Sequence, residues 1–132
     1  MAFFSSNMQA FNRTRQAHLA TALAVANTHW RRLRGLLGLD RDDFANGSGL
    51  WIVPCHGVHT LGMAFAIDVL YLDGELKVVG IQSEVRPWRF TPVLMRASSV
   101  LELPCGKAAE TNTAMGDTIE ITFSRDCSRI PA

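Results

Sequence analysis

The chain has no long apolar run. None of its 132 residues fall in a stretch that approaches the roughly 20 apolar residues of a membrane-spanning helix. Residues 19–26 (LATALAVA) are too short for the core of a signal peptide, and their apolar pattern continues into the next segment of the chain. We therefore expect a cytoplasmic protein without a membrane span.

An excess of charge of one sign is also missing. The net charge is +1, so no overall field favours nucleic acid or an anionic membrane as a partner. The expected partner is instead an unidentified small molecule or protein, with no nucleic acid.

Cysteine is scarce, and no two cysteines have the C-x-x-C spacing. Three cysteines are an odd number, which argues against a disulfide framework, and their scatter argues against a zinc knuckle. Cys55 and Cys105 each follow a proline beside a predicted strand end. We expect both to be reduced thiols that lie closer to each other than to Cys127, and we expect no cofactor.

What is present is typical of one globular domain, with 48% apolar and 19% charged residues. We predict an N-terminal tail over residues 1–18, a single domain over residues 19–123 and a C-terminal tail over residues 124–132. Within the domain, residues 21–26 are compatible with an edge strand. Trp30, Leu33 and Leu37 share one face of a predicted amphipathic helix that ends at Gly38.

Residues 66–72 form the strongest predicted strand, and a return strand covers residues 76–82. Asp73-Gly74 between them is typical of a two-residue type I′ hairpin, with Gly74 at positive φ and Val69 opposite Val78. Asp68 then points away from the face of Ile67 and Val69.

Two acidic residues inside predicted strands need an account. The Asp68 carboxylate requires hydrogen-bond donors, which we expect from the backbone or side chains of the neighbouring loop at His59 and Thr60. Glu102 lies within the strand of residues 100–103, and we expect it on a solvated face or paired with an arginine.

The segment from Trp51 to Asp73 has the highest concentration of potentially reactive or ligand-binding side chains. Its residues 54–62 carry a proline, two glycines, a cysteine and two histidines, which is typical of a loop at the surface or along a cleft. The candidate cleft comprises Cys55, His56, His59, Thr60, Met63, Asp68 and Cys105.

Several interpretations of this cleft stay open. Cys55, His56 and His59 are ligand types for zinc or copper, with Asp68 or Cys105 as a fourth ligand, although the spacing matches no standard structural site. Cys55 with a histidine and Asp68 as its orienter is a possible nucleophilic set. Alternatively, Cys55 is a small buried apolar residue and Asp68 pins the loop to the sheet.

Several motifs occur in an order that resembles the family known as domain of unknown function 192 (DUF192), over about residues 20–123. They are RLRGLLG at residues 32–38, PC at 54–55, VHTxGMxFxIDV at 58–69, VxP at 85–87, VLELPxG at 100–106 and GD at 116–117. The sequence departs from the family pattern at Ala66 and Cys105. The resemblance implies a single α+β domain of mostly antiparallel sheet, curled into a partly closed β-barrel with one packed amphipathic helix. It implies no activity.

From these observations we expect a small ligand- or partner-binding accessory domain with its cleft near the loop of residues 55–63. The alternatives are an enzyme that uses a Cys/His/Asp set or a bound metal, and a structural module that binds another protein.

Overall fold

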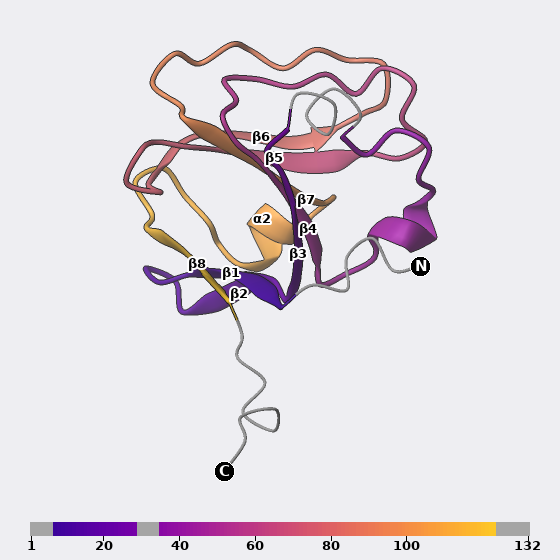
Figure 1. The fold of residues 1–132 in the computed structure, drawn as a ribbon. Coiled ribbons are helices and arrows are strands. Elements are labelled where there is room, and N and C mark those ends of the chain that lie inside the picture. Colours follow the sequence, from indigo (N-terminus) through magenta and orange to yellow (C-terminus); the bar gives the residue numbers. More distant parts are fainter. Residues whose placement is uncertain (1–6, 29–34, 124–132) are drawn as a thin grey trace.

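Two antiparallel-rich sheets make up the domain in the computed structural model, which describes residues 7–28 and 35–123 (Figure 1). The smaller sheet has the order β2-β1-β8 and the larger has the order β3-β4-β7-β5-β6. All strand pairs are antiparallel except β3 with β4. The elements are β1 (Met8–Asn12), β2 (Ala17–Ala20), β3 (Ala22–Ala26), the 3-10 helix η1 (Arg41–Phe44), β4 (Ser48–Ile52), β5 (Ile67–Leu72), β6 (Val78–Val85), β7 (Ser99–Pro104), α2 (Lys107–Glu110) and β8 (Ile119–Phe123).

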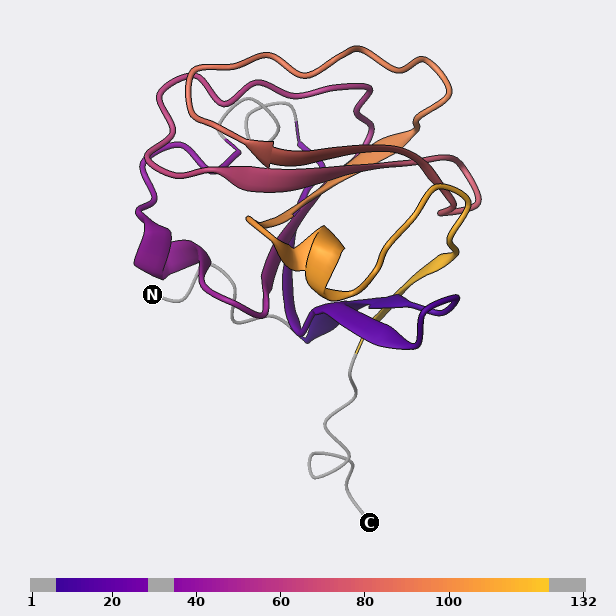
Figure 2. The same cartoon turned by 180° about the vertical axis from the view of Figure 1, so that it is seen from behind.

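The larger sheet is covered on both faces, so every residue of β5 is buried. On one face the loops of residues 53–66 and 86–97 cross the sheet, and on the other lie α2 and the smaller sheet (Figures 1 and 2). Successive strand residues point to opposite faces, so Ile67, Val69 and Tyr71 enter one core while Leu70 and Leu72 enter the other. Burial on both faces explains why β5 is a nearly continuous apolar run.

We name the two cores by what covers them. The loop-side core contains Ala26, Leu36, Phe44, Leu50, Ile52, Met63, Phe65, Ile67, Val69, Tyr71, Ala97 and Val100. The sheet-side core contains Ala10, Leu19, Ala20, Leu23, Leu70, Leu72, Val78, Leu101, Leu103, Ala108 and Ile119.

The expected partly closed barrel is wrong. Strands β3 and β6 are the edges of the larger sheet, and β1, β2 and β8 form a separate sheet among the described residues. Within the described residues an isolated bridge between Lys77 and Thr118 links the two sheets at one edge, but no named strand of one sheet pairs with a named strand of the other. The sheets therefore pack face to face through apolar side chains and do not close into a barrel.

The helix of the fold also differs from the expected one. The only α-helix within the described ranges is the four-residue α2. Residues 29–34 of the expected amphipathic helix lie outside the described residues, and residues 35–38 form turns, with Gly35 at φ 49° and Gly38 at φ 84°. None of the helices in these ranges is long and apolar enough to cross a membrane.

The sheet structure begins earlier than expected. Residues 8–12, placed by the sequence in an N-terminal tail, form β1, the central strand of the smaller sheet. Asn12 at its end is fully buried, and its amide donates to the Asp117 carboxylate at 3.0 Å. The sequence of β1 has no apolar period that would predict a strand. Its extended conformation is stabilised by pairing with β2 and β8.

The β5–β6 hairpin exists as expected, but its register was predicted wrongly. The Asp73 N–H donates to the Lys77 carbonyl at 2.9 Å, so the turn encloses residues 74–76. Positive φ falls at Leu76 (62°) and not at Gly74, as in a three-residue loop that ends in a left-handed residue. Val78 consequently lies opposite Leu72 instead of Val69, which moves its side chain to the sheet-side core.

This register makes a prediction about two turn glycines. A Cβ at Gly74 would meet only the Ser98 hydroxyl, at 3.7 Å, and Gly74 lacks positive φ, so Gly74→Ala should change the free energy of unfolding by less than about 0.5 kcal/mol. Gly116 has open space around it but φ 88°, so Gly116→Ala should destabilise by about 1 kcal/mol through backbone strain. Urea unfolding of both variants measures the difference; a larger loss for Gly74→Ala than for Gly116→Ala would contradict the register.

Candidate functional site

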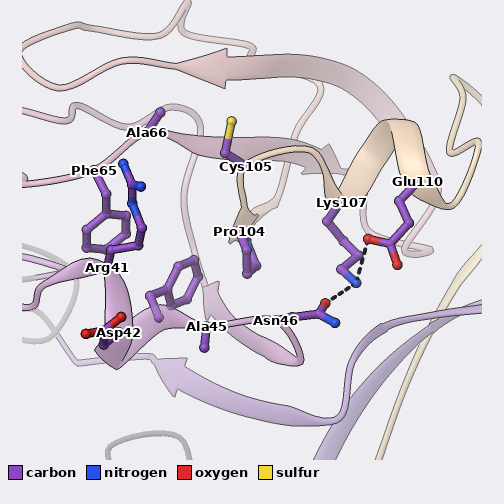
Figure 3. Close-up of a pocket in the computed structure, with 11 residues that line it drawn as sticks. Arg41, Asp42, Ala45, Asn46, Phe65, Ala66, Pro104, Cys105, Lys107 and Glu110 are labelled. Atoms are coloured by element: carbon purple, nitrogen blue, oxygen red, sulfur yellow. Dashed lines mark hydrogen bonds and ion pairs between the residues drawn. The ribbon is translucent and has the colours of Figure 1, made fainter.

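A cavity of about 570 Å³ opens between η1, the start of β5 and the β7–α2 turn (Figure 3). Its volume falls in the range of small-molecule sites. The residues that line it are Arg41, Asp42, Phe44, Ala45, Asn46, Phe65, Ala66, Pro104, Cys105, Lys107 and Glu110. Both positions at which the sequence departs from the family pattern, Ala66 and Cys105, are among them.

The aromatic wall of the cavity is set by η1. Asp40 caps this short helix by accepting the N–H groups of Asp42 and Asp43, and the Asp43 carboxylate accepts the Asp40 N–H in return. The turn directs Phe44 inward, where it is buried and stacks on Phe65 with ring centroids 5.7 Å apart. The two rings provide a rigid apolar surface.

Lys107 forms the opposite end of the cavity. It is the first residue of α2, and its side chain is only 7% exposed. Its ammonium donates to the Asn46 amide oxygen and pairs with the Glu110 carboxylate at 3.1 Å (Figure 3). These contacts use two of the three ammonium donors, which leaves one hydrogen-bonding position for a ligand.

Arg41 lies at the aromatic end. Its side chain extends along Phe65 in the direction of Ala66, whereas the Asp42 carboxylate lies on the other side (Figure 3). Within residues 7–28 and 35–123, the Arg41 guanidinium has no hydrogen bond or ion pair. The cavity therefore offers a planar cation with five donors next to an aromatic wall.

Cys105 stands at the rim of the cavity, and its side chain is a reduced thiol, as is that of Cys55. Burial raises the pKa of the Cys105 thiol above its ordinary value, as do the nearby Asp68 and Glu84 carboxylates, and Arg41 offsets only part of this rise. Because the thiolate is the nucleophilic form, a thiol with a raised pKa is poorly suited to attack a substrate.

Asp68 supports the cavity from the sheet side. It is fully buried, and its carboxylate accepts the Glu84 N–H at 2.9 Å and the Ala108 N–H at 2.8 Å. The expected donors from His59 and Thr60 were therefore the wrong ones. Asp68 instead ties the start of α2, and with it Lys107, to the irregular pairing of β5 with β6 near Glu84.

The loop of residues 55–63 serves another purpose. The Cys55 thiol donates to the Gly57 carbonyl at 3.1 Å, the His56 ring contacts the Ala97 carbonyl at 2.7 Å, and His59 Nδ1 accepts the Leu61 N–H at 3.2 Å. Thr60 is buried and donates to the Arg86 carbonyl at 2.6 Å. The contacts of Cys55 and His59 stay within the loop, whereas those of His56 and Thr60 attach it to the segment of residues 86–97.

The structure does not gather the seven candidate residues around one cavity. Cys105 lines the cavity, Asp68 braces its α2 end, and Met63 is buried in the loop-side core. Among the described residues no three His, Cys, Asp or Glu side chains are grouped as metal ligands. Asp68 accepts the backbone N–H groups of Glu84 and Ala108, whereas the His56 ring contacts the Ala97 carbonyl and the His59 ring the Leu61 N–H, so Asp68 does not orient either histidine for Cys55.

Sequence reasoning missed Arg41, Phe44, Phe65 and Lys107. Arg41, Phe44 and Lys107 lie outside every strand and helix that the sequence predicts. The one local signal was the Asp40–Asp43 capping pattern, which indicates a helical turn that points a following aromatic residue inward. That Phe44 meets Phe65 depends on the fold.

The comparison with sequence families agrees with the motifs. The DUF192 family model, described as Uncharacterized ACR, matches residues 10–121. The chain belongs to the DUF192 family. Two archaeal relatives bear the name UPF0127 protein. The one from Thermococcus sibiricus is 29% identical over 126 residues, 92% of this chain and 79% of the relative. The one from Pyrococcus abyssi is 35% identical over 63 residues, 48% of this chain and 53% of the relative.

Solved structures share the fold of this DUF192 chain. A Novosphingobium aromaticivorans protein of unknown function superposes with a TM-score of 0.70 at 18% identity, covering 86% of this chain and 82% of the other. A Sinorhizobium meliloti protein, described as a candidate transcription regulator, has the same TM-score and identity, covering 86% of this chain and 90% of its own. At this identity the likeness shows the fold alone, and the family remains uncharacterised.

Proposed function

We propose that this DUF192 chain is a binding protein whose cavity takes a small organic anion with an apolar, ring-like part. The observation that carries the proposal is an aromatic wall that lies next to two cationic side chains with hydrogen-bond donors still available. The ring centroids of Phe44 and Phe65 lie 5.7 Å apart. Arg41 lies beside these rings, and its guanidinium has no partner in the described ranges. The Lys107 ammonium has one N–H that is not used by its contacts with Asn46 and Glu110.

The chemistry of each end supports a different part of such a ligand. A guanidinium binds a carboxylate in a two-point arrangement, and it does so more strongly where apolar walls exclude water. The stacked rings suit a flat apolar group. The charge of Lys107 is largely balanced by Glu110, so we assign the main recognition of the anion to Arg41.

Binding is better supported than catalysis. The described residues that line the cavity include one thiol, whose pKa is raised mainly by burial, and no histidine. The residues that would activate a nucleophile are thus not at this site.

The test compares naphthoate with its neutral counterpart naphthamide by calorimetry. We expect the native protein to prefer naphthoate, and we expect Arg41→Gln to weaken naphthoate binding about 10-fold with little change for naphthamide, because only the charged hydrogen bond is lost. Arg13→Gln is the matched control, since Arg13 is an exposed arginine that pairs with Glu120 on the smaller sheet.

A second variant tests the location of the site. Ala66→Phe should fill the cavity and abolish binding of both compounds, because Ala66 lines it without contributing a polar group. Equal affinity of the native protein for both compounds would contradict an anionic ligand. Unchanged binding in Ala66→Phe would contradict this cavity as the site.

A further inference from the structure

The segment of residues 86–96 exposes an unusual set of side chains, which we call the apolar–arginine surface. Within residues 7–28 and 35–123, six large apolar side chains are exposed, and four of them lie in this segment. They are Trp88 (66%), Phe90 (75%), Val93 (70%) and Met95 (74%). Such a cluster is costly to leave in water and marks an interaction site.

The backbone beneath this surface is firmly held. The Thr60 hydroxyl donates to the Arg86 carbonyl and accepts the Arg89 N–H at 2.9 Å. The Tyr71 hydroxyl donates to the Pro92 carbonyl at 2.6 Å, and the Leu94 N–H donates to the His56 carbonyl at 2.8 Å. The apolar side chains are therefore displayed by an ordered crossing and do not result from a loosely packed loop.

Trp88 combines backbone strain with exposure. Its φ is 64°, a left-handed conformation that costs a residue with a side chain free energy, and its indole is two-thirds exposed. The Trp88 N–H donates to the Thr60 carbonyl at 2.9 Å, so the fold holds this backbone conformation while the ring stays exposed. Strain of this kind persists only where the surrounding structure enforces it, and it is frequent at functional sites.

Cations outnumber anions at this surface, where the exposed Glu84 lines one shallow pocket with Arg86 and Arg89. Arg86, Arg89 and Arg96 are exposed, and residues 85–97 contain no aspartate or glutamate. Arg86 and Arg96 have no ion pair with any described residue, and among these residues the Arg89 guanidinium donates only to the Trp88 carbonyl, at 3.3 Å. A nearly neutral chain thus presents a local cationic face that its net charge of +1 conceals.

We propose that the apolar–arginine surface docks on an anionic lipid membrane. Aromatic and apolar side chains that enter the headgroup region, ringed by cations that meet anionic lipids, are the two components of peripheral membrane binding. The segment forms the outermost crossing at the end of the molecule opposite β8 (Figures 1 and 2). One such loop lacks the roughly 20 residues per side of a stable protein interface, whereas insertion needs only a few side chains.

Vesicle co-sedimentation of the full chain tests the proposal. We expect binding to phosphatidylcholine vesicles that contain phosphatidylglycerol, and little binding to phosphatidylcholine alone. Phe90→Ser should lower the partition coefficient by about 10-fold, because the ring no longer leaves water. Phe123→Ser is the matched control: Phe123 is 72% exposed, against 75% for Phe90, but lies on β8.

The arginines are tested separately. The double variant Arg86→Gln/Arg96→Gln should bind the anionic vesicles about 10-fold more weakly than the native protein. Added salt should weaken vesicle binding of the native protein by a similar factor, because exposed charges are screened. Arg13→Gln with Lys77→Gln removes the same charge elsewhere and should leave binding unchanged. All the substituted side chains are exposed, so the thermal midpoint should stay constant and confirm that the variants are folded.

Two results would overturn the proposal. The first is absence of binding to the anionic vesicles, or binding that Phe90→Ser and Phe123→Ser reduce equally. The second is a dimer in solution that Phe90→Ser dissociates without any effect on vesicles, which would make the surface a contact between two copies of the chain.

Discussion

Replacing Glu102 with leucine should stabilise the protein. Glu102 lies on β7 opposite Leu50 and Val69, is 3% exposed, and its Oε2 has no hydrogen-bond partner among the described residues. The expectation that it faces solvent or pairs with an arginine was wrong. Burial raises its pKa from 4.5 to about 8, so the folded protein keeps a proton that the unfolded chain has lost at neutral pH.

The sign of the effect is set by proton binding. Between about pH 4.5 and pH 8 the folded state holds more protons at this site than the unfolded state, so its stability falls as the pH rises through this window. Holding the proton at pH 7 costs about 3 kcal/mol. Glu102→Leu removes that cost and should flatten the dependence of stability on pH.

Urea unfolding across this pH range measures both quantities. Glu102→Gln is the matched variant, since it removes ionisation but keeps a polar group, and it should flatten the pH dependence with a smaller gain in stability. Glu75→Gln changes an exposed glutamate and should do neither. A native protein whose stability rises steadily from about pH 5 to pH 8, with no gain in Glu102→Leu, would show that Glu102 is ionised and partnered.

Replacing Asp68 with leucine should have the opposite effect, a loss of about 2–4 kcal/mol. The change leaves the N–H groups of Glu84 and Ala108 without an acceptor; the Ala108 bond is buried and the Glu84 bond part-buried, and a buried unpaired donor costs about 1–3 kcal/mol. Asp68→Asn keeps one acceptor oxygen and should lose about half as much. The Ala108 amide should also lose its protection against hydrogen exchange, because its bond to Asp68 holds the first turn of α2.

Asp73 is an informative control for Asp68. Its carboxylate also accepts two backbone N–H groups, from Glu75 and Lys77, at 2.8 and 2.9 Å. These bonds are exposed, so water replaces the lost acceptor and Asp73→Leu should cost less than about 1 kcal/mol. Equal losses for Asp68→Leu and Asp73→Leu would refute the argument that burial sets the cost at Asp68.

The local sequence determined several features without help from the fold. The apolar run of residues 67–72 indicated the central strand, and Asp73-Gly74 placed the hairpin turn, because both depend on near neighbours along the chain. The sequence motifs were sufficient to identify the family. The lone Asp68 in an apolar strand indicated that hydrogen-bond donors inside the protein would contact its carboxylate.

Other features depended on where distant segments meet. The identity of the Asp68 donors, Glu84 and Ala108, is set by an irregular strand pairing and by the place where α2 packs, neither of which has a local pattern. The cavity joins Arg41 to Lys107 across the sheet, and β1 gains its order from β8 at the other end of the chain. The loop of residues 55–63 looked like a site because its residue types are reactive. The structure uses its backbone, Thr60 and His56 to hold the crossing that exposes Trp88 and Phe90. Residue type sets which bonds a side chain is able to make, and tertiary packing decides which partner is within reach.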